Sequence, residues 1–278
     1  MTSAEPPVTL GGDNAVATER SDLARQIFVL VSSVLAIVAA FIGAGVVIGT
    51  PIQDAAGGAL DADSTLIAPG TGAFRIWSVI YTGMLAYAIW QALPAQRRDV
   101  RQRRLGWWVS ASLVLNAAWI FSVQLDLLPL SLPIIVVLLA VLCRLFVVLR
   151  RVPPKNRVEA VVADGSIGLY LGWVVVATAA NAAAVLVTAG FDGFGLDPEL
   201  WAVVVLAVAA GIGVALALWG GGRIAPALSL CWGLSWVAVA RLGDEPYSVT
   251  TGIAAIIAAV IVAAATLFAR LRYDRHRV

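Results

Sequence analysis

Eight long apolar runs, each close to the length that crosses a lipid bilayer, constrain this chain more than any other feature. A membrane-spanning helix needs about 20 mostly apolar residues, because lipid offers no partner for backbone polar groups. Hydrophobic residues make up 60% of the chain and charged residues only 13%, which excludes an ordinary soluble domain. The sequence therefore predicts an all-α integral membrane protein. The predicted spans are Gln26–Gly49, Gly72–Leu93, Leu105–Val123, Leu130–Leu149, Gly165–Ala189, Glu199–Trp219, Ile224–Arg241 and Val249–Arg270.

The charges between these runs alternate in sign along the chain. Cytoplasmic connections are expected to be rich in Lys and Arg, whereas the opposite connections are not. The N-terminal tail, the second, fourth and sixth connections and the C-terminal tail carry arginines, and the odd-numbered connections carry Asp or Glu instead. Eight spans with both termini cytoplasmic satisfy every connection. A seven-span alternative would merge or drop a segment and break the alternation at one end.

Several classes of site are disfavoured. The polar residues before the first run lack the pattern of a signal peptide, so that run is expected to stay as a helix. Cys143 and Cys231 lie in apolar runs without Cys or His neighbours, which favours core packing over a disulfide or metal site. The single histidine, His276, follows the last span, and the arginines are topology signals rather than a nucleic-acid surface. We expect no metal, no catalytic residue and no nucleic-acid partner, and a location in a bacterial plasma membrane.

Charge inside the spans is almost absent. No Asp, Glu or Lys lies in the middle of a predicted span, which argues against a proton-coupled carrier built on a buried carboxylate. Arg144 is the exception. It lies about 9 Å along its helix from Arg150, so either its side chain reaches the cytoplasmic interface or its charge is functional.

Three spans carry amides and aromatic rings that apolar packing does not require. Helical spacing places each set on one face, and span direction places all three in the outer half of the bilayer. An apolar wall with a few placed polar groups is typical of a small-molecule pocket, but buried asparagines also join helices by hydrogen bonds. Both interpretations stay open. The candidate ligand-binding residues are Trp77, Tyr81, Asn116, Trp119, Trp173, Ala177 and Asn181.

One connection is long, from Thr50 to Thr71 on the non-cytoplasmic side. Its glycines and prolines disfavour a continuous helix. It is either a lid over an outward-facing pocket or a flexible surface loop.

These residues resemble the TspO/MBR family, the tryptophan-rich sensory proteins related to the mitochondrial translocator protein. Trp77 and Tyr81 are similar to the W-x-x-x-Y motif of the second family helix. Asn116 and Trp119 are similar to the L-N-x-x-W motif of the third. The set Trp173, Ala177 and Asn181 is similar to the W-x-x-x-A-x-x-x-N motif of the fifth.

The resemblance implies a five-helix bundle, commonly a dimer, that binds a porphyrin or a sterol-like lipid in a pocket closed by the first loop. It covers residues 26–190, after a polar tail at 1–25, and leaves three additional helices at 191–271 and a basic tail at 272–278. Two departures affect the expected lid contacts. The family commonly has a pair of prolines before its second helix, and only Pro69 is present here. In addition, Arg75 lies between Phe74 and Trp77. Two glycine pairs, Gly45 with Gly49 and Gly168 with Gly172, fit close helix packing and a homodimer.

Three functions follow from this interpretation. The first is a membrane sensor or translocator for a porphyrin or polycyclic lipid, with membrane lipid around it and no required cofactor. The second is a porphyrin-degrading membrane enzyme that uses tryptophans, since the spans offer no acid–base or metal groups. The third is a non-catalytic transporter or structural subunit in which the asparagines only join helices.

Overall fold

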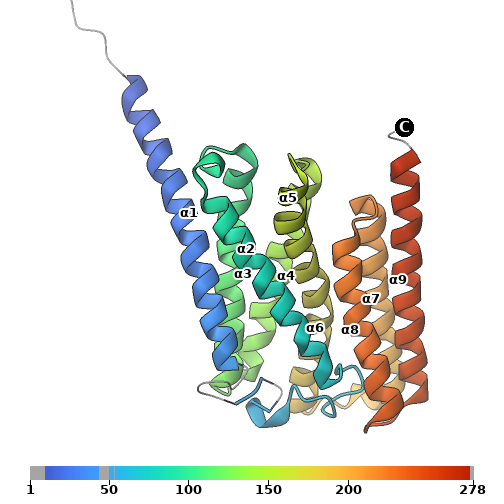
Figure 1. Ribbon diagram of the computed structural model, residues 1–278. Coiled ribbons are helices and arrows are strands. Elements are labelled where there is room, and N and C mark those ends of the chain that lie inside the picture. Colours follow the sequence, from blue (N-terminus) through green and yellow to red (C-terminus); the bar gives the residue numbers. More distant parts are fainter. Residues whose placement is uncertain (1–9, 44–49, 53, 276–278) are drawn as a thin grey trace, which may run out of the picture.

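The structure is a computed structural model that describes residues 10–43, 50–52 and 54–275, with side chains described from Glu19 onward. Within these residues every regular element is helical, and the long helices form one bundle (Figure 1). This confirms the all-α prediction. The long helices are α1 (Leu10–Gly43), α2 (Ile76–Ala92), α3 (Val100–Gln124), α4 (Leu128–Arg151), α6 (Ser166–Thr188), α7 (Pro198–Gly220), α8 (Ile224–Gly243) and α9 (Val249–Arg275).

Seven of the described helices are long and apolar enough to cross a membrane, and α2 is the long helix left out. It has 17 residues and continues directly from the five-residue 3-10 turn Thr71–Arg75. In Figure 1, α2 runs obliquely from one end of the bundle to the other. Helical structure therefore covers nearly all of the second predicted span, Gly72–Leu93, and the fold is that of a helical membrane protein.

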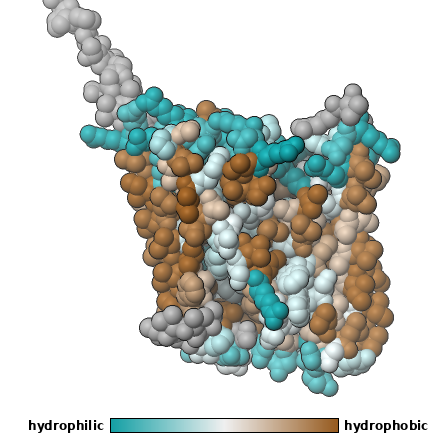
Figure 2. All heavy atoms as spheres, in the orientation of Figure 1, coloured by the Kyte–Doolittle hydropathy of each residue, from teal (hydrophilic) through white to brown (hydrophobic). Residues whose placement is uncertain are grey.

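The surface in Figure 2 has an apolar belt between two polar ends. The first described turns of α1 and the end of α9 lie at the same end of the bundle (Figure 1). We call it the arginine-rich end, because it carries the connections 93–99, 152–156 and 221–223 with their flanking arginines. The other end carries residues 50–70 and is called the loop end. This arrangement agrees with the predicted alternation of connections.

Two helices begin earlier than predicted. Helix α1 starts at Leu10, within the predicted polar tail, rather than at Gln26. The fifth span starts at α5 (Arg157–Glu159) and passes through a π-helical turn (Ala160–Gly165) before α6, whereas the sequence predicts a start at Gly165. The side chain of Asn156 accepts a hydrogen bond from the backbone N–H of Glu159 at 2.9 Å and caps this start. A prediction from the length of apolar runs misses this turn, because the turn carries charged side chains that form ion pairs inside the protein.

Helix α8 packs directly on α6 through two glycines. A Cβ atom at Gly168 would lie 2.8 Å from the Ala225 side chain, and one at Gly172 would lie 2.0 Å from the Pro226 carbonyl oxygen. The glycine pair that predicts a dimer face therefore joins two helices of the same chain. Gly45 and Gly49, the other predicted pair, lie outside the described residues.

The two cysteines differ in environment. Cys231 is half-buried, and its Sγ lies 3.4 Å from the Ala259 carbonyl oxygen. Cys143 is exposed, because α4 turns the neighbouring Leu142 and Leu145 into the core. The prediction of core packing is therefore wrong for Cys143.

Candidate ligand-binding site

The predicted site residues lie on three helices that surround an interior region near the loop end. Helix α2 packs along α1 and α6, α3 packs along α1 and α4, and α6 packs along α4 and α8. Asn116 lies eight residues before the end of α3, which is about 12 Å along the helix. Side chains from α2, α3 and α6 meet in this region, and each pair of these helices is bridged by predicted residues.

An aromatic cluster joins α2 to α6. Trp77 stacks on Tyr81 with ring centroids 5.2 Å apart and an interplanar angle of 19°. The Trp77 ring also meets Trp173 edge-on at 6.0 Å and Tyr170 at 5.9 Å. Phe74 makes a further edge contact with Trp173 at 6.0 Å. Such rings bury large apolar areas in a fixed geometry, so the cluster forms a rigid aromatic wall.

A hydrogen bond joins α3 to α2. The Asn116 Nδ2 atom donates to the Tyr81 hydroxyl at 2.7 Å, and Asn116 is buried. Asn116 Oδ1 has no hydrogen-bond partner, and neither has the indole Nε1 of Trp173, which is also buried. Because a buried polar atom without a partner is costly, these two atoms are the unsatisfied points of the site.

The second asparagine is fully engaged. Trp119 Nε1 donates to Asn181 Oδ1 at 2.9 Å, and Asn181 Nδ2 donates to Ser131 Oγ of α4 at 2.8 Å. Ser131 in turn donates to the Leu128 carbonyl oxygen at 2.6 Å. The amide of Asn181 therefore joins α3, α4 and α6, as the helix-joining interpretation predicts for this residue. Ala177, between Trp173 and Asn181 on α6, is half-buried.

We expect Asn181→Leu to lower the stability of the protein by about 0.6 to 2 kcal/mol, the range of such bonds between membrane helices. The substitution leaves Trp119 Nε1 and Ser131 Oγ without their partner. Thermal unfolding in detergent measures the change. Thr178→Ala is the matched control, because Thr178 lies on the same helix and bonds only the Val174 carbonyl oxygen of that helix. Equal melting temperatures for the two variants would contradict a joining role for Asn181.

The long loop is packed on α8. Residues 54–70 cross the loop end from α1 towards α8 (Figure 1). Thr65, Ile67 and Ala68 are buried, and Ile67 packs in the core cluster that contains Leu234 and Val237 of α8. The predicted break in helical structure is confirmed here, since the described part of the loop contains only the short 3-10 turn Ala56–Gly58. The loop covers the end of the bundle on which the site lies.

Tryptophans of α8 hold the end of the loop at the start of α2. The Gly70 N–H donates to the Trp236 carbonyl oxygen at 3.1 Å, and Trp232 Nε1 donates to the Ala73 carbonyl oxygen at 3.0 Å. A Cβ atom at Gly72 would lie 2.1 Å from the Trp236 ring, so the glycine allows the ring to lie directly on the backbone. Trp77 follows five residues later, and the position of α8 thus affects the aromatic wall.

A buried arginine holds the middle of the loop. Arg241, in the last turn of α8, is fully buried. Its guanidinium donates to the carbonyl oxygens of Ala62 at 2.5 Å, Thr65 at 3.3 Å and Pro246 at 3.0 Å. The additional helices therefore supply the groups that fix the loop, a role for which the sequence offers no residue-level account. By contrast Arg75, the predicted departure next to the site, is exposed.

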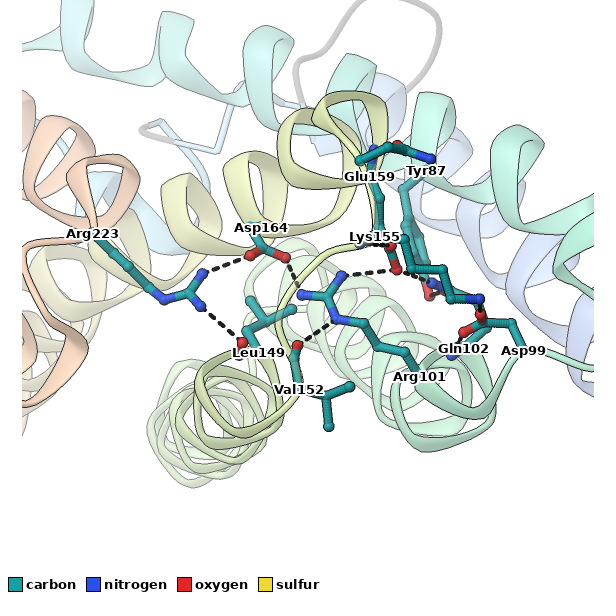
Figure 3. A network of polar contacts seen from close by, with 11 residues as sticks. Tyr87, Asp99, Arg101, Gln102, Leu149, Val152, Lys155, Glu159, Asp164 and Arg223 are labelled. Carbon is teal, nitrogen blue, oxygen red and sulfur yellow. Dashed lines mark hydrogen bonds and ion pairs between the residues drawn. The ribbon is translucent and has the colours of Figure 1, made fainter. Parts of the chain in front are cut away.

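A second polar cluster lies at the arginine-rich end (Figure 3). Arg101 of α3 is buried and pairs with Glu159 at 3.0 Å and with Asp164. Its Nε donates to the Val152 carbonyl oxygen at 2.8 Å. Arg223, between α7 and α8, pairs with Asp164 at 2.6 Å and donates to the Leu149 carbonyl oxygen at 2.8 Å. Two arginines and two carboxylates thus join α3, α4, α5, the π-helical turn and α8.

This cluster extends to α2 through neutral groups. Gln102 Nε2 donates to Glu159 at 2.8 Å, and the Tyr87 hydroxyl donates to Gln102 Oε1 at 2.9 Å. Glu159 also accepts from the Lys155 backbone N–H at 2.7 Å. The Glu159 carboxylate is satisfied on several sides, as a buried charge requires. Within the described residues no group of three His, Cys, Asp or Glu side chains is placed to hold a metal ion.

A cavity of about 1400 Å³ opens at the arginine-rich end between α4, the π-helical turn, the end of α7, α8 and α9. Asp164, Arg223, Phe268 and Tyr273 contribute to its lining. The seven predicted site residues do not line it. The chain therefore has an aromatic cluster near the loop end and a separate open cavity at the other end.

Sequence reasoning missed four kinds of contributor to these regions. Tyr170 lies three residues before Trp173, so its helical spacing was a usable signal. Ser131 had no such signal, because a hydroxyl in an apolar helix usually bonds its own backbone. Arg241 falls at a predicted span edge, and Arg101 and Glu159 fall in predicted connections, where charges are ordinarily assigned to water. Their burial depends on contacts between distant segments.

The comparisons with known proteins give one match. A family model described as TSPO-like protein matches residues 26–268. The match includes α7, α8 and most of α9, so it extends beyond the first 190 residues on which the sequence motifs rest. Neither the comparison with curated proteins nor that with solved structures finds a match.

Proposed function

The chain belongs to the family of TSPO-like proteins, and from this premise we propose that it is a membrane sensor or translocator for a flat hydrophobic ligand. The ligand is a porphyrin or a sterol-like lipid, and it binds between α2, α3 and α6. The site consists of the predicted residues together with Tyr170.

The two buried polar atoms without partners support this proposal most strongly. Asn116 Oδ1 is a free acceptor and Trp173 Nε1 is a free donor, and both belong to helices that face the same aromatic cluster. If the Oδ1 and Nδ2 atoms of Asn116 exchanged places, one of them would still be unpaired, because the Tyr81 hydroxyl bonds only one amide atom. A ligand that carries one donor and one acceptor on a flat apolar body would satisfy both atoms. A porphyrin has such groups in its pyrrole N–H and its carboxylates.

The aromatic wall supports a flat ligand over a flexible one. The Trp77 and Tyr81 rings are nearly parallel, and the Trp173 ring stands edge-on to Trp77 with an interplanar angle of 83°. A polycyclic body gains apolar burial and ring contacts against these faces. Asn181 and Trp119 serve in this proposal as the support that holds α3 against α6.

The loop supports a site that closes on its ligand. Residues 54–70 cover the loop end and are held by Trp236 and Arg241, and Trp232 holds the adjoining turn at Ala73. These contacts belong to α8 rather than to the helices of the site. Release of the loop from Arg241 would open the site without disturbing its walls, because the Arg241 hydrogen bonds go to Ala62, Thr65 and Pro246 and not to the aromatic wall.

A titration of intrinsic tryptophan fluorescence with protoporphyrin tests the proposal. We expect saturable quenching in the wild type and a dissociation constant raised about threefold to tenfold in Trp173→Phe, since one hydrogen bond of about 0.5–1.5 kcal/mol is lost. Trp219→Phe is the control, because Trp219 is exposed near the end of α7 at the arginine-rich end, and the affinity of this variant should equal that of the wild type.

Two outcomes of this titration would overturn the proposal. One is quenching that never saturates in the wild type. The other is an equal dissociation constant for Trp173→Phe and the wild type. A purely structural role for the asparagines further predicts that no ligand raises the melting temperature, whereas the proposed site predicts a rise with ligand concentration.

A further inference from the structure

A basic cavity at the arginine-rich end is separate from the proposed ligand site. It has a volume of about 300 Å³ and lies between the first turns of α3 and the last turns of α4. Its size is at the lower limit of small-molecule sites, which are about 300–1,000 Å³. The lining consists of Arg103, Arg104, Trp107, Trp108, Arg144, Val148, Arg151 and Val152.

The lining carries four guanidinium groups and no carboxylate. Arg103 pairs with Asp22 of α1 at 2.5 Å, which neutralises one of the four charges. Arg104, Arg144 and Arg151 are exposed, and no ion pair joins them to a described acidic residue. Three cations that share one cavity repel one another unless an anion lies between them. The cavity thus has the electrostatic character of an anion site.

Arg144 places one of these charges closer to the apolar belt than the others. It lies seven residues before Arg151, which is about 10 Å along α4 and towards the apolar belt. Its guanidinium lies over the Trp108 ring at 5.9 Å from the centroid. The Arg144 side chain forms one wall of the cavity, and the proposal below takes up the alternative of a functional charge.

The two tryptophans indicate where the cavity lies relative to lipid. Trp107 and Trp108 are 44% and 40% exposed, and Trp107 packs against Phe28 of α1 at 5.4 Å. Exposed indole rings near the ends of membrane helices are enriched at the level of lipid headgroups. An anion bound here would be at the depth of a phospholipid phosphate.

We propose that this cavity is a binding site for an anionic phospholipid of the leaflet at the arginine-rich end. The phosphate lies among Arg104, Arg144 and Arg151, and the acyl chains follow the apolar surface of α3 and α4. Basic cavities between membrane helices on the cytoplasmic side bind anionic headgroups by the same combination of charge and depth. The assignment does not depend on the proposed ligand of the aromatic site.

Native mass spectrometry of the purified full chain with added lipid tests this assignment. The probes are phosphatidylglycerol and, at equal concentration, zwitterionic phosphatidylcholine. We expect phosphatidylglycerol to be retained in preference, and we expect Arg144→Gln and Arg104→Gln each to reduce its retention about fivefold. Arg275→Gln is the matched control, because it removes one positive charge at the same end but outside the cavity.

Three outcomes would overturn the assignment. The first is equal retention of the two lipids. The second is an equal effect of Arg275→Gln and Arg144→Gln on the retention of phosphatidylglycerol. The third is displacement of phosphatidylglycerol by millimolar inorganic phosphate, because this would show a site for free phosphate instead. Arg104→Gln keeps the test valid if Arg144→Gln fails to fold, since the Arg104 side chain is exposed and in the second turn of its helix.

Discussion

Replacement of Arg101 by methionine is expected to lower the free energy of unfolding by about 3–5 kcal/mol, the cost of leaving one member of a buried ion pair without its partner. Arg101 and Glu159 are each 1% exposed and lie 3.0 Å apart. In Arg101→Met the Glu159 carboxylate keeps its contacts with Gln102 and the Lys155 N–H but has no cation. Asp164 keeps Arg223, so the main loss falls on Glu159.

Denaturant titration in detergent micelles measures this loss, and two further variants identify its origin. Arg98→Gln is the control, because Arg98 and Glu19 form an exposed pair at the same end, and little change is expected. The double variant Arg101→Met with Glu159→Met should recover part of the loss, since it removes both buried charges together. If the double variant is no more stable than Arg101→Met alone, the loss does not come from a stranded carboxylate.

Replacement of Arg241 by methionine is expected to release the loop. The change removes the donor to three backbone carbonyl oxygens, those of Ala62, Thr65 and Pro246, and each unsatisfied carbonyl costs about 1–3 kcal/mol where water does not replace the donor. Because Ala62 and Thr65 belong to the loop, the effect should concentrate there. Hydrogen exchange of residues 54–70 should therefore rise strongly, and global stability should fall.

The same variant distinguishes a closing loop from a passive one. In Arg241→Met we expect protoporphyrin to dissociate faster while the walls of the site stay intact. Arg75→Gln is the control, because Arg75 also lies at the loop end but is exposed. Hydrogen exchange that stays at the wild-type level in residues 54–70 would show that Arg241 does not hold the loop.

The spans and the grouping of the candidate residues were predictable because both follow local rules. A run of apolar residues fixes a membrane helix by its length, and helical spacing fixes which side chains share a face. Trp77 with Tyr81 and Trp173, and Asn116 with Tyr81, are brought together as this reasoning requires. The division of roles between the two asparagines was not predictable, since it depends on Ser131 of a fourth helix.

The role of the last three helices could not be read from the sequence. Trp232, Trp236 and Arg241 contact a loop about 160 to 180 positions earlier in the chain, as the pairs with Ala73 and Ala62 show. Hydropathy ranks Arg241 and Arg101 as boundary residues, because it scores each residue without its partners. Burial of a charge is decided by the carbonyls and carboxylates that other segments bring to it. The family match extends to residue 268 and therefore covers most of these helices.

The central claim, a ligand site between α2, α3 and α6 beneath the loop, is tested most directly by a structure determined with protoporphyrin bound. The account predicts density for the ring against Trp77 and Trp173, with a pyrrole nitrogen at hydrogen-bond distance from Asn116 Oδ1 and an oxygen at such a distance from Trp173 Nε1. Density only in the cavity at the arginine-rich end, among Asp164, Arg223 and Tyr273, would contradict it.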